Sequence, residues 1–155
     1  MDVAFYHSPI GMLRIQAAND LIASVSFTDD LPEISILPNG ELARCIGQLD
    51  EYFSGKRDHF ELRMAPEGTS FQQRVWQELH KIPFGKTTSY MDLAKRLGDP
   101  KVIRAAARAN GKNPIAIIIP CHRVIGSDGG LTGYAGGLER KKWLLEHESA
   151  QVSLF

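Results

Sequence analysis

The sequence has little cysteine and no long apolar run, and both scarcities exclude whole classes of protein. Its 155 residues include only Cys45 and Cys121, far apart in unlike surroundings, so a reduced, cytoplasmic protein is a better prediction than a disulfide-stapled secreted one. No apolar run approaches the roughly 20 residues of a membrane span, and the first residues lack the features of a signal peptide. The five histidines are scattered and do not pair with cysteine at zinc-site spacing. We therefore expect no membrane partner, no metal and no cofactor.

The net charge is zero, but this average hides two oppositely charged halves. Residues 1–70 hold 5 Lys+Arg and 11 Asp+Glu, a net charge of −6, whereas residues 71–155 hold 13 Lys+Arg and 7 Asp+Glu, a net charge of +6. Such an asymmetry is typical of a polyanion-binding site in one half of the chain. A solvated basic face explains the charge equally well, so charge alone does not predict DNA binding.

The beginning of the chain has the pattern of a small sheet. Apolar and polar residues alternate over residues 11–17 and 21–27, and Asn19 and Asp20 between them favour a turn. We expect a further strand at residues 3–6, so the sequence predicts a sheet of short strands.

A helix should follow this sheet. Apolar residues at helical spacing predict a helix over residues 42–53, with Cys45 on its buried face. Residues 59–64 are another expected strand, and residues 65–68 have the composition of a linker. We therefore predict a small mixed domain over residues 1–65 and a second domain over residues 66–155.

Helix start and stop signals recur through the second domain. Thr69 and Ser89 are good N-caps, and Asp99 followed by Pro100 is a strong helix start. Two short helices joined by a turn containing glycine form a helix-turn-helix signature, although proteins that do not bind DNA also contain helix pairs. The predicted helices cover residues 70–82, 89–97, 100–110 and 138–148.

The helix predicted over residues 100–110 carries a stripe of positive charge. Lys101, Arg104 and Arg108 lie at i, i+3 and i+7, and four alanines flank them. Small side chains allow a helix backbone to approach a partner closely, and the helix has few long polar side chains for reading bases. This pattern favours phosphate contact and groove shape over sequence reading, unless the alanines simply pack against neighbouring helices.

The segment around Cys121 is the best candidate for chemistry. An apolar run over residues 115–119 predicts a buried strand that stops at Pro120, so that Cys121 emerges beside His122 and Arg123. Cationic neighbours lower the pKa of a thiol and make it a nucleophile, although a half-buried structural cysteine is the alternative. His122 would need a carboxylate to orient it, and spacing leaves four candidates open: Asp128, Glu139, Glu146 and Glu148.

Several segments in order make this chain similar to a known family, the O6-alkylguanine-DNA alkyltransferases, or methylated-DNA–protein-cysteine methyltransferases. The likeness covers most of residues 70–148. It rests on residues 83–85, 88–90, 104–105, 113–114, 120–124, 133–137 and 143–148. The resemblance implies an α+β fold, with a small N-terminal α/β (ribonuclease H-like) domain and a mostly helical C-terminal domain with a helix-turn-helix.

The resemblance also implies a reaction and its residues. Cys121 would take the alkyl group from the guanine oxygen in one displacement and would act once per molecule. His122 would deprotonate it through a bound water, with Glu148 orienting His122. Asn113 resembles the residue that braces the active-site turn, and Tyr90 the tyrosine that donates to the guanine ring as negative charge develops.

The implied partner is double-stranded DNA containing alkylated guanine, bound by a monomer through the minor groove largely independently of sequence. Arg104 resembles the arginine that fills the space left by the extruded nucleotide. The expected DNA-binding residues are Arg104, Ala105, Lys101, Arg108 and Arg123, and the expected pocket residues are Val124, Tyr134 and Ala135. Some members carry a serine where this chain has Ala135, so a side-chain hydroxyl contact is missing, and the zinc ligands of some relatives have no counterpart.

Three alternative functions are compatible with parts of the sequence. A non-catalytic damage-recognition module of the alkyltransferase-like type would lack the reactive cysteine, which this chain has. A cysteine hydrolase would need direct contact between Cys121 and His122, which adjacency disfavours because neighbouring side chains on an extended segment point apart. A helix-turn-helix regulator would need strong sequence preference, which an alanine-rich helix should not give.

Overall fold

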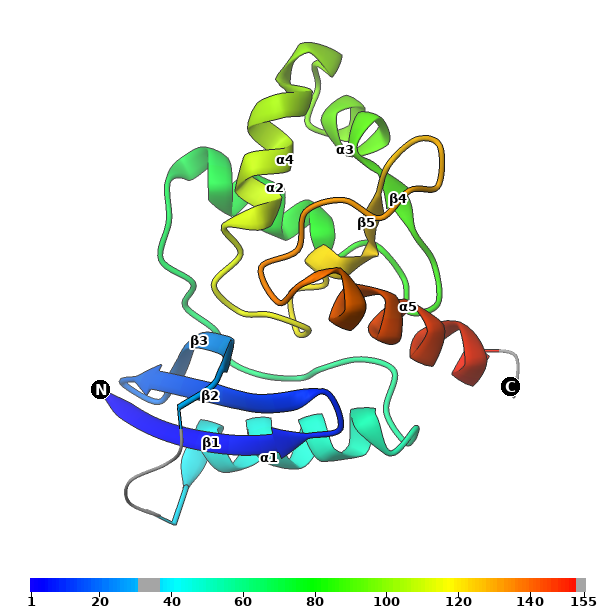
Figure 1. Ribbon diagram of the computed structural model, residues 1–155. Coiled ribbons are helices and arrows are strands. Elements are labelled where there is room, and N and C mark those ends of the chain that lie inside the picture. The colour runs from blue at the N-terminus through cyan, green and yellow to red at the C-terminus, as the bar shows by residue number, and fades with distance from the viewer. Residues whose placement is uncertain (31–36, 153–155) are drawn as a thin grey trace. The chain divides into compact units, whose positions relative to one another are not determined.

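The computed structural model describes residues 1–30 and 37–152 of the chain (Figure 1). The chain divides into two compact units. The first consists of Met1–Glu67 together with Pro114–Ile118, and the second of Gly68–Asn113 together with the residues from Ile119 onward. Within the described residues, no helix combines the length and the apolar character needed to cross a membrane.

A three-stranded antiparallel sheet forms the centre of the first unit. Strands β1 (Asp2–Ser8), β2 (Gly11–Ala18) and β3 (Leu21–Thr28) pair in sequence order, which confirms the predicted strands. Asn19 and Asp20 both adopt positive φ, 53° and 60°, as the tight turn between β2 and β3 requires. The turn therefore sets the register that buries alternate residues of β2.

Helix α1 (Gly40–Phe53) packs on this sheet and confirms the predicted helix (Figure 1). Its buried face includes Leu42, Cys45, Leu49 and Tyr52. Burial raises the pKa of Cys45 to about 12, with a smaller contribution from the negative charge of Glu41. Cys45 is therefore an unreactive core residue, as its position on the apolar face predicted.

The strand expected at residues 59–64 is wrong. Only Met64 forms a bridge, to Ile22, and side chains of α1 bind the backbone before it. The Gln48 amide accepts from the backbone N–H of Glu61 and donates to the backbone oxygen of Glu61. Backbone groups satisfied by side chains in this way need no neighbouring strand.

The strand expected at residues 115–119 is also wrong, although its burial is right. Val25 of β3 donates to the Pro114 oxygen and accepts from the Ala116 N–H, which leaves a single bridge residue, Ile115. The chain then turns, with Ile117 at φ 70°, a rare conformation for a β-branched residue. The apolar run thus reports that the segment is buried but not that it is extended.

The second unit is mostly helical. Its helices are α2 (Ser70–Leu79), α3 (Tyr90–Arg96), α4 (Ile103–Gly111) and α5 (Leu138–Val152). Between them lie two 3₁₀-helices, η1 (Pro100–Val102) and η2 (Cys121–Arg123), and two short parallel strands, β4 (Thr88–Ser89) and β5 (Val124–Ile125). The predicted helices are confirmed, although α2 ends before residue 82 and the helix that starts at Pro100 begins with a 3₁₀ turn.

The predicted N-caps define these helices. The side chains of Thr69, Ser89 and Asp99 each accept a hydrogen bond from a backbone N–H in the following turn. Helices α3 and α4 pack against each other and against α2. The Trp76 indole nitrogen of α2 donates to the Ala109 oxygen of α4 at 2.9 Å. The α3–α4 pair is therefore held firmly on the core of its unit.

Candidate active site

Two asparagines hold the backbone around Cys121. Cys121 begins η2 and is only 6% exposed. The Asn113 amide nitrogen donates to the Ile119 oxygen at 2.7 Å, and the Asn110 amide nitrogen donates to the Cys121 oxygen at 3.3 Å. The amides of Asn113 and Asn110 thus both hold the backbone of this turn, and the sequence did not reveal the contact of Asn110.

The electrostatic setting of the Cys121 thiol differs from the sequence-based expectation. Burial raises the pKa of the Cys121 thiol, and a hydrogen bond with the Asn113 side chain and the positive charge of Lys141 offset part of this rise. We expected a lowered pKa caused by His122 and Arg123. Burial outweighs the favourable contacts, and the adjacent cation Arg123 binds a carboxylate instead.

Glu148 of α5 is the carboxylate that binds His122. The distance from His122 Nε2 to Glu148 Oε2 is 2.7 Å, and both side chains are almost completely buried. The structure thus brings Glu148 to His122, as the family resemblance implied. A carboxylate is an acceptor, so Nε2 carries a proton toward Glu148, and in the neutral imidazole Nδ1 holds the lone pair. Among the described residues, Nδ1 has no hydrogen-bond partner.

Arg123 completes this buried cluster. Its Nε lies 2.7 Å from Glu148 Oε1 and its second terminal nitrogen 3.1 Å from Oε2, while the other terminal nitrogen donates to the Ile82 oxygen. Burial alone would raise the pKa of Glu148, but His122 and Arg123 outweigh it and hold the pKa well below its usual range. Glu148 is therefore a carboxylate at neutral pH.

The expected role of Arg123 in DNA binding needs correction. Its side chain is 9% exposed, and its guanidinium is committed to Glu148 and Ile82. A guanidinium with these partners is not available to phosphate, so we assign Arg123 to the support of Glu148. The position of Arg123 directly after His122 suggested a cation on the surface, but the turn of η2 directs the Arg123 side chain inward.

Tyr90 and Lys141 converge on one backbone carbonyl. The Tyr90 hydroxyl donates to the Thr132 oxygen at 3.1 Å, and the Lys141 ammonium donates to the same oxygen at 2.8 Å. The ammonium also lies 5.8 Å from the centre of the Tyr90 ring, within cation–π range. Tyr90 at the start of α3 is thus linked to the loop that carries Thr132.

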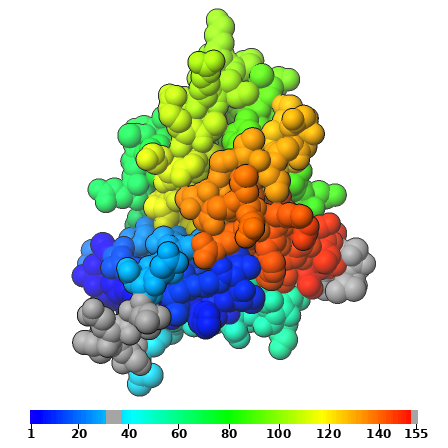
Figure 2. Space-filling model, viewed as in Figure 1, coloured from blue at the N-terminus to red at the C-terminus, as the bar shows by residue number. Residues whose placement is uncertain are grey.

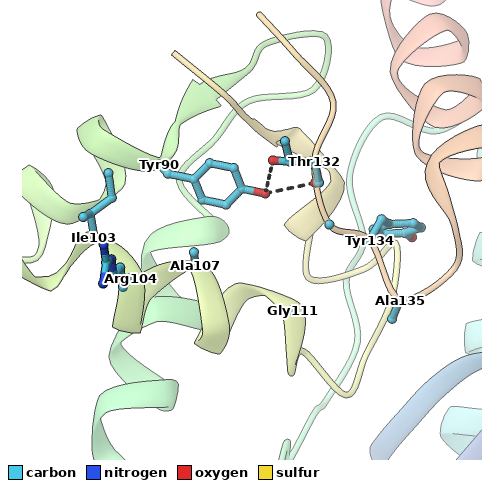
Figure 3. A pocket seen from close by; sticks show the side chains of 9 residues that line it. Tyr90, Ile103, Arg104, Ala107, Gly111, Thr132, Tyr134 and Ala135 are labelled. Atoms are coloured by element: carbon cyan, nitrogen blue, oxygen red, sulfur yellow. Dashed lines mark hydrogen bonds between the residues drawn. The ribbon is translucent and has the colours of Figure 1, made fainter. Parts of the chain in front are cut away.

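A cavity of about 710 Å³ lies beside this loop (Figure 3). Tyr90, Arg104 of α4, Tyr134 and Ala135 all line it, so four predicted site residues surround one space. The Tyr134 hydroxyl is buried without a hydrogen-bond partner among the described residues. Burial and the charge of Cys121 raise the pKa of Tyr134 well above its usual value, which keeps the phenol protonated.

Val124 does not line this cavity as the structure describes it. It is buried in β5, opposite Thr88 of β4. The pairing of β4 with β5 connects the segment after Cys121 to the residues just before Tyr90. The backbone of the cysteine segment and the start of α3 are therefore fixed relative to each other.

The basic stripe of η1 and α4 lies on the surface. Lys101, Arg104 and Arg108 are exposed, and Figure 2 shows the outer face of α4, in yellow-green, open in this view. Ala106 and Ala109 are buried against the unit's core, whereas Ala107 lines the cavity. Ala105 is half-buried. Packing thus explains two of the four alanines. The other two have small side chains that project little from the helix.

Asn110 and Lys141 are the site residues that sequence reasoning missed. Lys141 lies at i, with Leu144 and Glu148 at i+3 and i+7, so helical periodicity alone places it on the buried face of α5. Asn110 comes just before the helix-ending Gly111, where an amide can reach a following turn. Both signals are present in the sequence, but neither by itself indicates contact with the cysteine segment.

Comparison with known proteins connects this geometry to a family. The model described as "6-O-methylguanine DNA methyltransferase, DNA binding domain" matches residues 70–150, and the ribonuclease-like domain of the same family matches residues 1–66. The methylated-DNA–protein-cysteine methyltransferase of Methanosarcina acetivorans is 43% identical, with 97% of this chain and 99% of that protein covered. The Mycobacterium leprae protein of the same name is 47% identical over 94% of this chain and 90% of its own length.

Solved structures agree with these matches. The O6-methylguanine methyltransferase of Mycobacterium tuberculosis superposes with a TM-score of 0.86 at 38% identity, covering 99% of this chain and 98% of that one. A structure titled as Mycobacterium tuberculosis OGT in complex with DNA gives a TM-score of 0.85 at 41% identity, covering 95% and 92% of the two chains. This chain therefore belongs to the 6-O-methylguanine DNA methyltransferase family.

Proposed function

We propose that this protein repairs DNA by transferring an alkyl group from O6-alkylguanine to its own Cys121, once per molecule. The observation that carries the proposal is the arrangement of His122, which is fixed by Glu148 through Nε2 and has an unpartnered Nδ1 one residue from the cysteine. A base held in this way needs a nearby proton donor, and the Cys121 thiol is the nucleophile beside it.

The chemistry is a single displacement at the alkyl carbon. The proton of Cys121 passes to His122 Nδ1 through a bound water, and the thiolate attacks the alkyl carbon. The S–C bond forms while the C–O6 bond breaks, and the electron pair of that bond stays with the guanine. The net reaction turns thiol and alkylguanine into thioether and guanine. The proton that sulfur loses therefore ends on the guanine that leaves. A thioether is stable, and the other cysteine of the chain, Cys45, is buried in the core of the first unit and would not regenerate the thiol.

The cavity beside the 132–135 loop is the proposed site of the extruded guanine. A base must leave the helical stack before a thiolate can reach its oxygen substituent. The Tyr90 hydroxyl, now donating to the Thr132 oxygen, can turn to donate to the guanine ring as negative charge develops. The carbonyls of Cys121 and Val124 are the proposed acceptors for the guanine amino group.

The proposed DNA-binding surface is the outer face of η1 and α4. Lys101 and Arg108 would contact phosphates, and Arg104, at the edge of the cavity, would fill the space left by the extruded nucleotide. Ala105 lets the helix approach the minor groove closely. The scarcity of long polar side chains on this helix supports binding that is largely independent of sequence, and the protein would bind as a monomer.

The division into domains of residues 1–65 and 66–155 and a cytoplasmic location are also part of the proposal. Both described cysteines are free, which supports a reducing environment.

Transfer of a labelled methyl group tests the proposed function directly. Incubation with duplex DNA containing O6-methylguanine should raise the intact mass by one methyl group in place of one hydrogen, on the peptide that contains Cys121. Cys121→Ala should show no increase, whereas Cys45→Ala should react like the wild type because Cys45 is an inert core residue. An unchanged mass of the wild-type protein after incubation with damaged duplex would refute the proposal.

A further inference from the structure

Thr132 contacts the Tyr90 hydroxyl twice, once through its backbone and once through its side chain (Figure 3). The Tyr90 hydroxyl donates to the Thr132 backbone oxygen at 3.1 Å. The Thr132 hydroxyl lies 3.4 Å from the Tyr90 oxygen and is placed to donate to it. No predicted role accounts for Thr132, although it lines the same cavity as Tyr90.

The Tyr90 hydroxyl has one proton to donate, and in the structure that proton is used on the Thr132 backbone oxygen. For Tyr90 to donate to the extruded guanine, its O–H bond must turn away from this oxygen. The Lys141 ammonium donates to the same oxygen at 2.8 Å, so the turn leaves no unpaired acceptor behind. The resting hydrogen bond is therefore one that Tyr90 can give up at low cost.

The Thr132 side chain keeps its place beside Tyr90 during this turn. Rotation of the phenol O–H bond moves the proton but not the oxygen, so the Thr132 hydroxyl remains next to that oxygen. Its distance of 3.4 Å is long for two hydroxyls, which ordinarily bond at roughly 2.5–3.0 Å. Hydrogen bonds of catalytic groups are often long before the substrate binds and shorten in the reacting complex. Chained hydrogen bonds also polarise one another, so a phenol that accepts one becomes a stronger donor.

We propose that Thr132 is a positioning residue for Tyr90: its side-chain hydroxyl donates to the Tyr90 oxygen while the Tyr90 hydroxyl donates to the leaving guanine. The hydrogen bonds then run from Thr132 through Tyr90 to the base. Neither hydroxyl loses its proton, and no covalent bond to either residue forms or breaks. This inference deepens the proposed function and rests on it.

The alternative is that the Thr132 side chain only shapes the loop. Thr132 is exposed, and Lys141 binds its backbone oxygen whatever side chain the residue carries. Loss of the hydroxyl should therefore leave the loop in place. An effect on loop shape would be the same with or without the Tyr90 hydroxyl, whereas an effect through Tyr90 requires that hydroxyl. The two roles thus differ in whether the losses at the two positions add.

A double-mutant cycle tests the proposal, with single-turnover methyl transfer from duplex DNA containing O6-methylguanine as the measurement. Thr132→Val keeps the branched shape and should slow transfer about fivefold, the effect of losing one neutral hydrogen bond. In the Tyr90→Phe background the same replacement should change the rate by less than about twofold. Thr132→Ser keeps a hydroxyl and should restore nearly the wild-type rate. Thr87→Val is the matched control, because Thr87 is exposed in the same unit and should leave the rate unchanged.

The rate at which iodoacetamide alkylates Cys121, followed by peptide mapping, shows whether the substitution disturbs the cysteine itself. Iodide leaves without a proton donor, so Thr132→Val should react with iodoacetamide like the wild type. A loss in this reaction as well, or an equal loss of methyl transfer with and without the Tyr90 hydroxyl, would overturn the inference alone. A wild-type protein that takes no methyl group from damaged duplex would instead refute the proposed function, and this inference with it.

Discussion

His122 Nε2 donates a hydrogen bond to Glu148 Oε2 over 2.7 Å, and the neighbouring Arg123 binds the same carboxylate. Two consecutive residues of η2 are therefore fixed by one side chain of α5. The carboxylate sets the histidine tautomer, and the arginine keeps the carboxylate ionised. The proposed base, His122, is thus oriented by a contact between segments that are far apart in the sequence.

Replacing Glu148 should impair transfer strongly. In Glu148→Gln the amide can no longer act as a charged acceptor, so the imidazole loses its fixed tautomer and the support of a negative charge. We expect single-turnover methyl transfer at neutral pH to slow by about 100-fold or more, the scale of general base catalysis. Glu146→Gln is the control, because Glu146 is exposed on the same helix and makes only a long contact of 3.9 Å to Lys142. Equal rates for both variants would contradict the role of Glu148.

The Glu148 cluster should also make stability depend on acid. The pKa of Glu148 is lower in the folded protein than its ordinary value of 4.5, so its contribution to stability is complete above that value and is lost as the pH falls toward the folded pKa. Glu148→Gln should be less stable by about 3–5 kcal/mol at neutral pH, because it leaves Arg123 buried without its charge partner. Urea unfolding from pH 7 downward should show that the difference in free energy of unfolding between wild type and variant becomes smaller below pH 4.5. A difference that stays constant would exclude Glu148 as the cause of the acid dependence.

Arg104→Ala should separate reaction in duplex DNA from reaction with the free base. If Arg104 fills the place of the extruded nucleotide, its loss should reduce transfer from duplex DNA about tenfold or more while leaving reaction with free O6-alkylguanine nearly unchanged. Parallel rate measurements with the two substrates check this. Lys81→Ala serves as the control, because Lys81 pairs with Glu78 at the end of α2. Equal losses with both substrates would remove the stacking role.

Tyr90→Phe should slow the chemical step without weakening DNA binding. The variant loses the hydroxyl that could donate to the leaving guanine, but Lys141 still binds the Thr132 oxygen and holds the loop. We expect a decrease of roughly 10-fold to 100-fold in transfer rate, in the lower part of the range for one positioned donor. Single-turnover methyl-transfer assays and equilibrium binding to damaged duplex measure the rate and the DNA affinity separately. An unchanged rate would exclude Tyr90 from the mechanism.

Salt dependence distinguishes the exposed arginines from the buried one. Arg108 is exposed on α4, so Arg108→Ala should reduce the slope of log affinity against log salt concentration by about 0.9, the value for one phosphate contact. Arg123→Lys should leave the slope unchanged and lower the free energy of unfolding, because Arg123 binds Glu148 rather than DNA. Binding titrations at several salt concentrations measure both slopes, and a smaller slope for Arg123→Lys would restore Arg123 to the DNA-binding surface.

Local signals predicted the elements of the fold well because the causes of those elements are local. The turn at Asn19 and Asp20, the caps at Thr69, Ser89 and Asp99, and the apolar periodicity of α1 each act within a few residues. The expected strands at residues 59–64 and 115–119 failed for a different reason. Their backbone partners are supplied by α1 side chains or by tight turns, which no alternation pattern encodes.

The site shows the same division between local and distant causes. Adjacency in sequence placed Arg123 beside the thiol, but the folded chain directs its guanidinium to Glu148 of α5. The family resemblance selected Glu148 among four acids because it carries information about tertiary contacts. Spacing along the chain could not select Glu148 over Glu146, since these two acids differ only in the face of α5 that they occupy.

The passage of residues 114–118 through the first unit limits how this protein can be divided. The chain crosses between the units after Glu67, after Asn113 and again after Ile118. A cut in the linker would leave a C-terminal fragment whose Pro114 and Ala116 have lost their backbone partner Val25, a few residues ahead of Cys121. A chimera that takes its N-terminal unit from a relative would therefore have to take residues 114–118 from that relative as well. The segment to exchange is thus not one contiguous stretch of sequence.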